Sequence, residues 1–114
     1  MKQATRLLAV MAALLLSAPI SLSASAGAAP TKPVAVEIRN FAFWPKTLTV
    51  SAGTRVVWTN RDDEPHVVVS AGHQFASSVA LDTSDSYAVT FDHAGTYTYY
   101  CAIHPMMVGT IIVQ

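Results

Sequence analysis

The sequence contains a single cysteine, Cys101, in 114 residues. No intramolecular disulfide can form, so the disulfide framework that stabilises many small exported domains is excluded. A lone thiol in an oxidising compartment is a chemical liability unless something occupies it. A bound metal ion would occupy and protect such a thiol.

The sequence also lacks an excess of charge of either sign. Charged residues make up 12% of the chain, with seven basic and seven acidic side chains and no basic run. If residues 1–28 are removed, Lys2 and Arg6 are lost and the net charge falls from zero to about −2. Nucleic-acid binding depends on clustered Lys and Arg that neutralise phosphates. We therefore expect no nucleic-acid partner.

No hydrophobic run is long enough to span a bilayer. The longest, residues 7–16, is well short of the roughly 20 residues that a spanning helix needs. It follows Lys2 and Arg6 and precedes two A-x-A patterns, at residues 24–26 and 26–28. This order is typical of a secretory signal peptide. We predict a signal peptide at residues 1–28, cleaved after Ala26 or Ala28, with a retained membrane anchor as the alternative.

The remaining chain, residues 29–114, is expected to form one domain that is periplasmic or secreted, monomeric and not inserted in a membrane. Short runs rich in β-branched and aromatic residues alternate with turn residues, which is typical of an all-β sandwich or barrel. The predicted strands are residues 34–38, 48–50, 55–59, 67–69, 87–91, 96–100 and 110–113. Residues 74–81 have some helical character, but Ser77, Ser78 and Val79 make a poor helix.

Three potential metal ligands follow one predicted strand at short spacing. Cys101, His104 and Met107 form a C-x2-H-x2-M pattern directly after residues 97–100. His66 follows Pro65 at the start of another β run, so it can reach the same end of a sandwich. Two imidazoles, a thiolate and a weak thioether are the ligands of a blue-copper site. Zinc fits less well, because thioether is not among its usual ligands.

Simpler interpretations of these residues remain open. A lone cysteine is most often a small buried hydrophobic residue, and a methionine is usually core filler. Met106, beside Met107, is the other candidate for the thioether ligand. His73 and His93 have no second ligand candidate beside them, and we interpret both as solvated. We interpret the charged run 62–64 as a solvated turn.

At these residues the chain resembles the cupredoxins, the type 1 blue-copper proteins, and is most similar to those of the amicyanin, pseudoazurin and plastocyanin type. The resemblance is strongest over residues 86–113. It extends upstream through residues 43–50, 52–54, 57–60 and 65–66, and so covers essentially the whole predicted mature chain.

The resemblance implies a Greek-key β-sandwich of about seven to eight strands. It also implies one copper ion per chain held by His66, Cys101, His104 and Met107, and a tyrosine corner at Tyr97. The chain departs from the family at two positions. Where amicyanin-like proteins usually have an asparagine and a hydroxyl residue that link the two ligand loops, this sequence has Val67 and Ala102.

From the ligand set and the resemblance we predict a small electron-transfer protein that cycles copper between Cu(I) and Cu(II) and meets an unidentified redox protein. His104 should lie at the surface within an apolar rim, and His66 should be more buried. The alternatives are a copper carrier or storage module and a metal-free structural sandwich. An enzyme is not expected, because a Cys–His hydrolase needs an orienting third group and an oxyanion hole, and too few histidines remain for a multicopper oxidase.

Overall fold

The computed structural model describes residues 13–21 and 32–114. Residues 13–21 form neither helix nor strand, and all are exposed. Lys2, Arg6 and both A-x-A patterns lie outside the described residues. Within the described part of the chain, no helix is long and apolar enough to cross a membrane.

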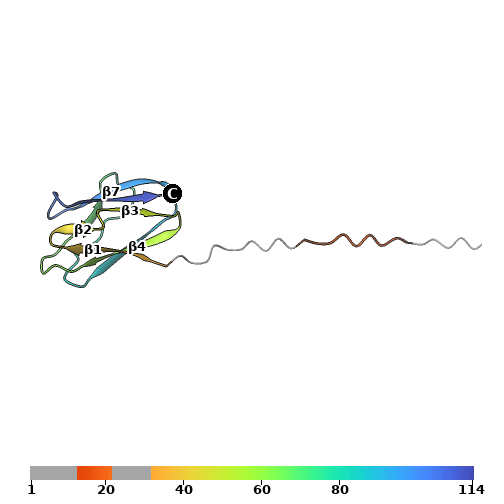
Figure 1. Ribbon diagram of the computed structural model, residues 1–114, viewed down its shortest axis with the longest axis horizontal. Helices are drawn as coiled ribbons and strands as arrows, with labels where there is room; N and C mark the ends of the chain where they lie inside the picture. The colour runs from red at the N-terminus through yellow and green to blue at the C-terminus, as the bar shows by residue number, and fades with distance from the viewer. Residues whose placement is uncertain (1–12, 22–31) are drawn as a thin grey trace, which may run out of the picture.

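Eight strands form two four-stranded sheets in the described residues (Figure 1). One sheet has the order β2-β1-β4-β6 and the other the order β3-β8-β7-β5. The strands are β1 Val34–Arg39, β2 Ala42–Trp44, β3 Thr47–Val50, β4 Thr54–Asn60, β5 Val68–Ser70, β6 Ser86–Phe91, β7 Gly95–Cys101 and β8 Val108–Val113.

Most connections between successive strands cross from one sheet to the other, as in Greek-key sandwiches. β1 pairs with β4, and β3 with β8, in parallel, while the remaining neighbours are antiparallel. The prediction of an all-β sandwich is therefore confirmed.

The core lies between the sheets and follows the two-residue period of the strands. In β7, Tyr97, Tyr99 and Cys101 are buried, whereas Thr96 and Thr98 on the opposite face are exposed. β4 alternates in the same way, and its Trp58 contacts aromatic rings on several neighbouring elements. Cys101 therefore ends a strand whose inner face is anchored in the core, which gives its thiol a rigid mount.

β2 is the strand that the sequence did not predict. It has three residues, and it follows a tight turn in which Asn40 and Phe41 have positive φ angles of 51° and 55°. A strand this short has too few residues for a two-residue period to stand out. The turn brings Phe41 close to the residues of the predicted copper site.

Two local expectations concern the loops. The Tyr97 hydroxyl donates to the His93 carbonyl at 2.7 Å, which is the tyrosine corner that the resemblance implied. Residues 74–81 form no helix. Their end is tied into the fold because Leu81 pairs with His66 in an isolated β-bridge.

Candidate metal centre

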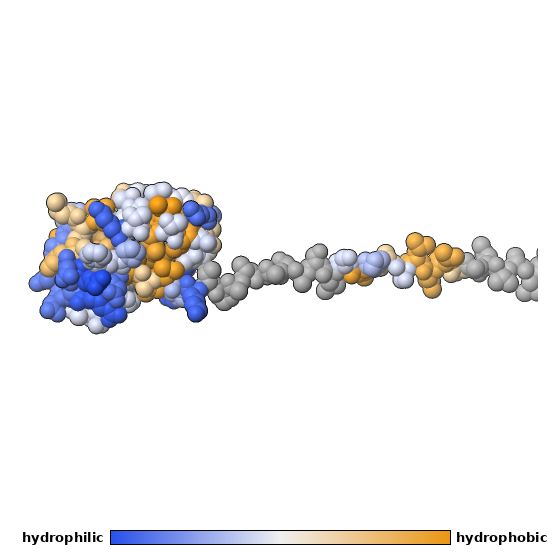
Figure 2. All heavy atoms as spheres, viewed as in Figure 1, coloured by the Kyte–Doolittle hydropathy of each residue, from blue (hydrophilic) through white to orange (hydrophobic). Residues whose placement is uncertain are grey.

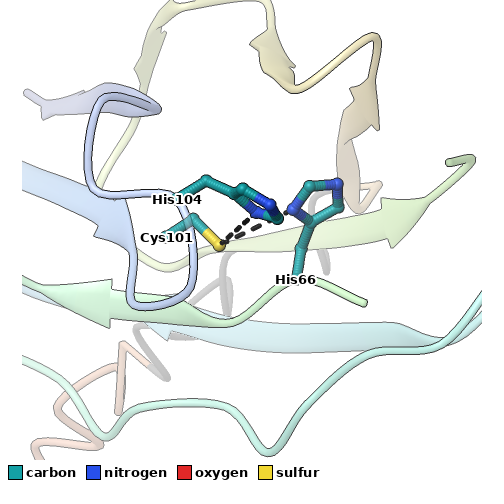
Figure 3. A group of neighbouring side chains, drawn as sticks. All are labelled: His66, Cys101 and His104. Carbon is teal, nitrogen blue, oxygen red and sulfur yellow. Dashed lines mark hydrogen bonds between the residues drawn. The ribbon is translucent and has the colours of Figure 1, made fainter. Parts of the chain in front are cut away.

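The side chains of His66, Cys101 and His104 converge at one end of the sandwich (Figure 3). The Cys101 Sγ lies 3.6 Å from His66 Nδ1 and 3.9 Å from His104 Nδ1. One ligating atom from each residue lies within 4.8 Å of the others. This spacing brings two nitrogens and one sulfur around a point where a single ion can sit.

Two separate elements position these ligands. Cys101 is the last residue of β7 and pairs with Val68 of β5. His66 precedes β5, and its backbone exchanges hydrogen bonds with Leu81, N–H to O at 3.1 Å and O to N–H at 2.7 Å. Because the β5–β7 pairing sets the register of both segments, His66 and Cys101 reach the same end of the sandwich.

The loop from Cys101 to Met107 is closed by its own backbone. The Cys101 N–H donates to the Met107 carbonyl at 3.1 Å, and the Met107 N–H donates to the His104 carbonyl at 2.9 Å. These bonds curl the loop so that His104 reaches the cysteine. His66 is fully buried and His104 is half-buried, in agreement with the predicted order of exposure.

The two methionines of this loop have opposite environments. Met107 is 5% exposed and belongs to the core cluster, whereas Met106 is 96% exposed. Met107 shares this buried cluster with Cys101, whereas the Met106 side chain is directed to solvent. The burial of Met107 is compatible with the predicted role of axial thioether.

The backbone of Val67 supplies a polar link between the two ligand loops that its side chain cannot make. The Val67 N–H donates to Cys101 Sγ at 3.3 Å. The link between the two ligand loops thus persists through the main chain even though Val67 and Ala102 carry no polar side-chain atoms.

The interpretation of residues 62–64 as a solvated turn is wrong for Asp62. Asp63 and Glu64 are exposed, but the Asp62 side chain is 12% exposed and its Oδ2 lies 2.9 Å from His66 Nε2. Asp62 also accepts hydrogen bonds from the backbone N–H groups of Asn40 and Phe41. Burial raises the pKa of the Asp62 carboxyl, but the hydrogen bonds from Phe41, His66 and Asn40 outweigh it and hold that pKa below its usual value.

Phe41 is the second contact that the sequence did not indicate. Its ring meets the rings of His66 and His104 edge-on, with centroids 5.5 Å and 5.0 Å away. Phe41 and the two histidines are far apart in sequence, so no spacing pattern could have shown the contact. One available signal for Asp62 was its position four residues before His66.

The other histidines do not join the cluster. His73 and His93 are exposed, in agreement with their interpretation as solvated residues. Among residues 13–21 and 32–114, the His66–Cys101–His104 set is the group of potential ligands that comes together closely enough for an ion.

The donor set fits copper better than zinc. Two imidazole nitrogens and one thiolate form a three-donor plane, and the residue that could complete it is a buried methionine. Thiolate and thioether are soft ligands, and the combination with two histidines is that of blue-copper centres. The residues present therefore fit the ion that the sequence predicted.

This fold and site define a copper-binding β-sandwich, and comparison with known proteins agrees. The model of the cupredoxin-like domain matches residues 6–113. The chain belongs to the cupredoxin-like family.

Curated relatives include amicyanin from Paracoccus versutus, 33% identical over 89 residues, which cover 75% of this chain and 67% of the relative. Chloroplastic plastocyanin from Tetradesmus obliquus is 36% identical over 109 residues, which cover 85% of this chain and 74% of the relative. The chain thus spans about two thirds of the amicyanin and about three quarters of the plastocyanin.

Solved structures give the same result. A purple cupredoxin from Nitrosopumilus maritimus superposes with a TM-score of 0.66 at 31% identity, covering 71% of this chain and 99% of that protein. A mutant amicyanin in its oxidised state superposes with a TM-score of 0.68 at 30% identity, covering 72% of this chain and 82% of that protein. Both matches agree with the cupredoxin-like fold.

Proposed function

We propose that the protein is a small blue-copper electron carrier that passes one electron at a time through a Cu(I)/Cu(II) site. The observation that carries this proposal is the convergence of Cys101 Sγ with the Nδ1 atoms of His66 and His104. Amicyanin and plastocyanin, to which the chain is similar, are electron carriers of this class.

The proposed ligands are His66, Cys101, His104 and Met107, with one copper ion per chain. Copper supplies the one-electron chemistry, and the protein's role is to hold the ligands in one arrangement for both oxidation states. Three features support a rigid site: Cys101 ends a core strand, His66 is bridged to Leu81, and the loop before β8 is closed by backbone hydrogen bonds. Small ligand movement on electron transfer favours a fast reaction.

The surface around His104 suits brief contact with a redox partner. The half-buried His104 ring lies beside Phe41, and exposed apolar side chains surround this end of the molecule, namely Phe41 at 50%, Ile103 at 47% and Met106 at 96%. In Figure 2, moderately hydrophobic atoms gather at the left end, over the loop between β7 and β8. Weak electron-transfer interfaces are small, so a patch of this kind is sufficient for docking.

Electron exchange between copies of the protein separates a carrier from a copper storage module. When Cu(I) protein is mixed with increasing Cu(II) protein, rapid exchange broadens the NMR signals near the site in proportion to the oxidised fraction. We expect such broadening. Cu(I)-protein signals near the site that keep their linewidth at every mixing ratio would contradict a carrier function and favour storage.

A pair of variants tests the proposed exit for electrons. Met106→Lys adds a charge to the apolar patch and should slow the exchange, because two patches must then meet with like charges. Thr96→Lys adds the same charge at the opposite, exposed end of β7 and serves as the matched control. Equal rates for the two variants would contradict transfer through the patch around His104.

We also infer that residues 1–28 are a signal peptide and that residues 29–114 act outside the cytoplasm. Within residues 13–21, four large apolar side chains are 82% to 93% exposed, at Leu14, Leu15, Leu16 and Ile20. Cleavage would remove these exposed apolar side chains, which a mature soluble domain rarely carries as a contiguous patch. Intact-mass measurement of protein from the exported fraction should give a chain beginning at Gly27 or Ala29, and an uncleaved chain there would contradict the inference.

A further inference from the structure

One carboxylate ties the loop that carries His66 to the turn between β1 and β2. Asp62 Oδ1 accepts a hydrogen bond from the Asn40 N–H at 2.7 Å. Asp62 Oδ2 accepts one from the Phe41 N–H at 2.9 Å and lies 2.9 Å from His66 Nε2. The carboxylate therefore stands directly behind the imidazole, on the side away from Cys101.

The chemistry of these contacts assigns the proton on His66. The two backbone N–H groups can only donate, and Asp62 Oδ2 already accepts one of them while it faces His66 Nε2. An ionised carboxylate accepts from all three groups when His66 Nε2 carries the ring proton and donates it. In the neutral ring His66 Nδ1 then keeps its lone pair, and this is the atom that lies 3.6 Å from Cys101 Sγ.

We propose that Asp62 is a positioning residue of the metal centre, which fixes His66 with the Nδ1 lone pair facing Cys101 and favours Cu(II) over Cu(I). The second half of this inference rests on the proposed function, because it concerns copper bound at His66. A carboxylate on the outer nitrogen of a ligand histidine makes the imidazole a stronger donor. Its negative charge also interacts more strongly with the doubly charged ion than with the singly charged one.

The same carboxylate holds the aromatic cover of the site. Asn40 and Phe41 both have positive φ angles, and their N–H groups are directed to Asp62. The Phe41 ring in turn contacts both histidine rings. Asp62 thus links the orientation of His66 with the position of Phe41, and its loss should disturb the histidine and its cover together.

Asp62→Asn and Asp63→Asn form a matched pair for the test. Each removes one negative charge at neighbouring positions, but Asp62 contacts His66 whereas Asp63 is exposed. In Asp62→Asn the new NH2 group must face at least one of the three donors, because asparagine offers a single acceptor oxygen. Whichever way the amide turns, His66 Nε2 loses its ionised acceptor and faces either a neutral amide oxygen, which is a weaker acceptor, or a competing NH2 donor.

The first measurement uses the metal-free protein. Long-range nitrogen–proton NMR of the ring of His66 should show Nε2 protonated and Nδ1 unprotonated in the unsubstituted chain and in Asp63→Asn. The preference should weaken or reverse in Asp62→Asn. A proton on Nδ1 in the unsubstituted metal-free protein would overturn the proposal without requiring any variant to fold.

The second measurement is the copper affinity in both oxidation states. Loss of an outer hydrogen-bond partner lowers metal affinity by about 10- to 100-fold. We expect Asp62→Asn to bind Cu(II) at least about tenfold more weakly with a smaller loss for Cu(I), and each tenfold change in the ratio of the two affinities raises the reduction potential by about 59 mV. Equal potentials for Asp62→Asn and Asp63→Asn would overturn the proposal, because only the long-range charge would then matter.

The two proposals fail in different ways. If the unsubstituted protein binds Cu(II) without thiolate ligation, the blue-copper function fails, while the NMR of the metal-free protein still tests whether Asp62 orients His66. If thiolate ligation is present and the two variants behave alike, only the role of Asp62 fails.

Discussion

Met107 is buried against the core at 5% exposure, while its neighbour Met106 projects into solvent at 96% exposure. The hydrogen bond from the Met107 N–H to the His104 carbonyl fixes this difference, because it turns the chain inward just before β8. Adjacent residues of the same type therefore have different proposed roles, one at the copper site and one on the docking surface.

Leucine substitutions at the two methionines should separate these roles. Met107→Leu removes a weak axial donor from the proposed site, and since that donor stabilises Cu(II), the reduction potential should rise by more than about 59 mV, equivalent to a tenfold change in relative affinity. Met106→Leu, which preserves the apolar surface, should leave the potential unchanged. Voltammetry of both variants checks the prediction. A larger shift in Met106→Leu than in Met107→Leu would contradict it, because Met106 would then be the thioether ligand.

Gly109 in β8 allows Tyr99 of β7 to fill the core. A Cβ atom at position 109 would lie 2.3 Å from both the Cζ and the hydroxyl oxygen of Tyr99, which is fully buried and cannot move aside. Gly109→Ala should therefore lower the free energy of unfolding by about 1–3 kcal/mol, the usual cost of overpacking.

Gly72→Ala is the control for this substitution. Its Cβ would meet only the flexible Gln74 side chain at 3.5 Å, so urea unfolding of the metal-free protein should show little change. Equal stability of the two alanine variants would contradict the packing described for β7 and β8.

Tyr99 also predicts how stability responds to alkaline pH. Burial raises the pKa of the Tyr99 phenol from 10.0 to about 12. Below pH 10 the phenol is protonated in both folded and unfolded chains. Between pH 10 and 12 the unfolded chain loses the proton more readily, so the free energy of unfolding falls as pH rises, by about 2–3 kcal/mol in total.

Tyr99→Phe isolates this contribution. Within the described residues the Tyr99 hydroxyl is buried without a hydrogen-bond partner, so its removal should change stability at pH 8 by less than about 1 kcal/mol. At pH 12 the variant should be more stable than the unsubstituted protein. Urea unfolding of the metal-free proteins at both pH values checks this, and parallel pH profiles for the two proteins would contradict the buried neutral phenol.

Much of the candidate site could be predicted because three of the four proposed ligands follow one strand. Cys101, His104 and Met107 lie within seven residues of each other, and the structure brings Cys101 and His104 together in that loop. His66 was predicted from its place before a β run, and the structure brings its Nδ1 to 3.6 Å from Cys101 Sγ.

Asp62 and Phe41 could not be predicted, because their roles depend on the tertiary structure. Asp62 reaches the backbone of Asn40 and Phe41 across 22 and 21 residues of sequence. That contact depends on the positive φ angles of the turn before β2, and an isolated Asn-Phe pair does not predict such angles. β2 was missed for a related reason, since three residues give too little alternation to distinguish a strand from a loop.

The central claim is that one copper ion is bound by the Cys101 thiolate together with His66 and His104. The most direct test is the optical and EPR spectrum of the mature protein after addition of one equivalent of Cu(II), with Cys101→Ser as the comparison. We expect an intense visible thiolate-to-copper charge-transfer band and a narrow copper hyperfine splitting, both lost in Cys101→Ser. A weak absorption with the spectrum of ordinary tetragonal copper, unchanged in Cys101→Ser, would contradict the account.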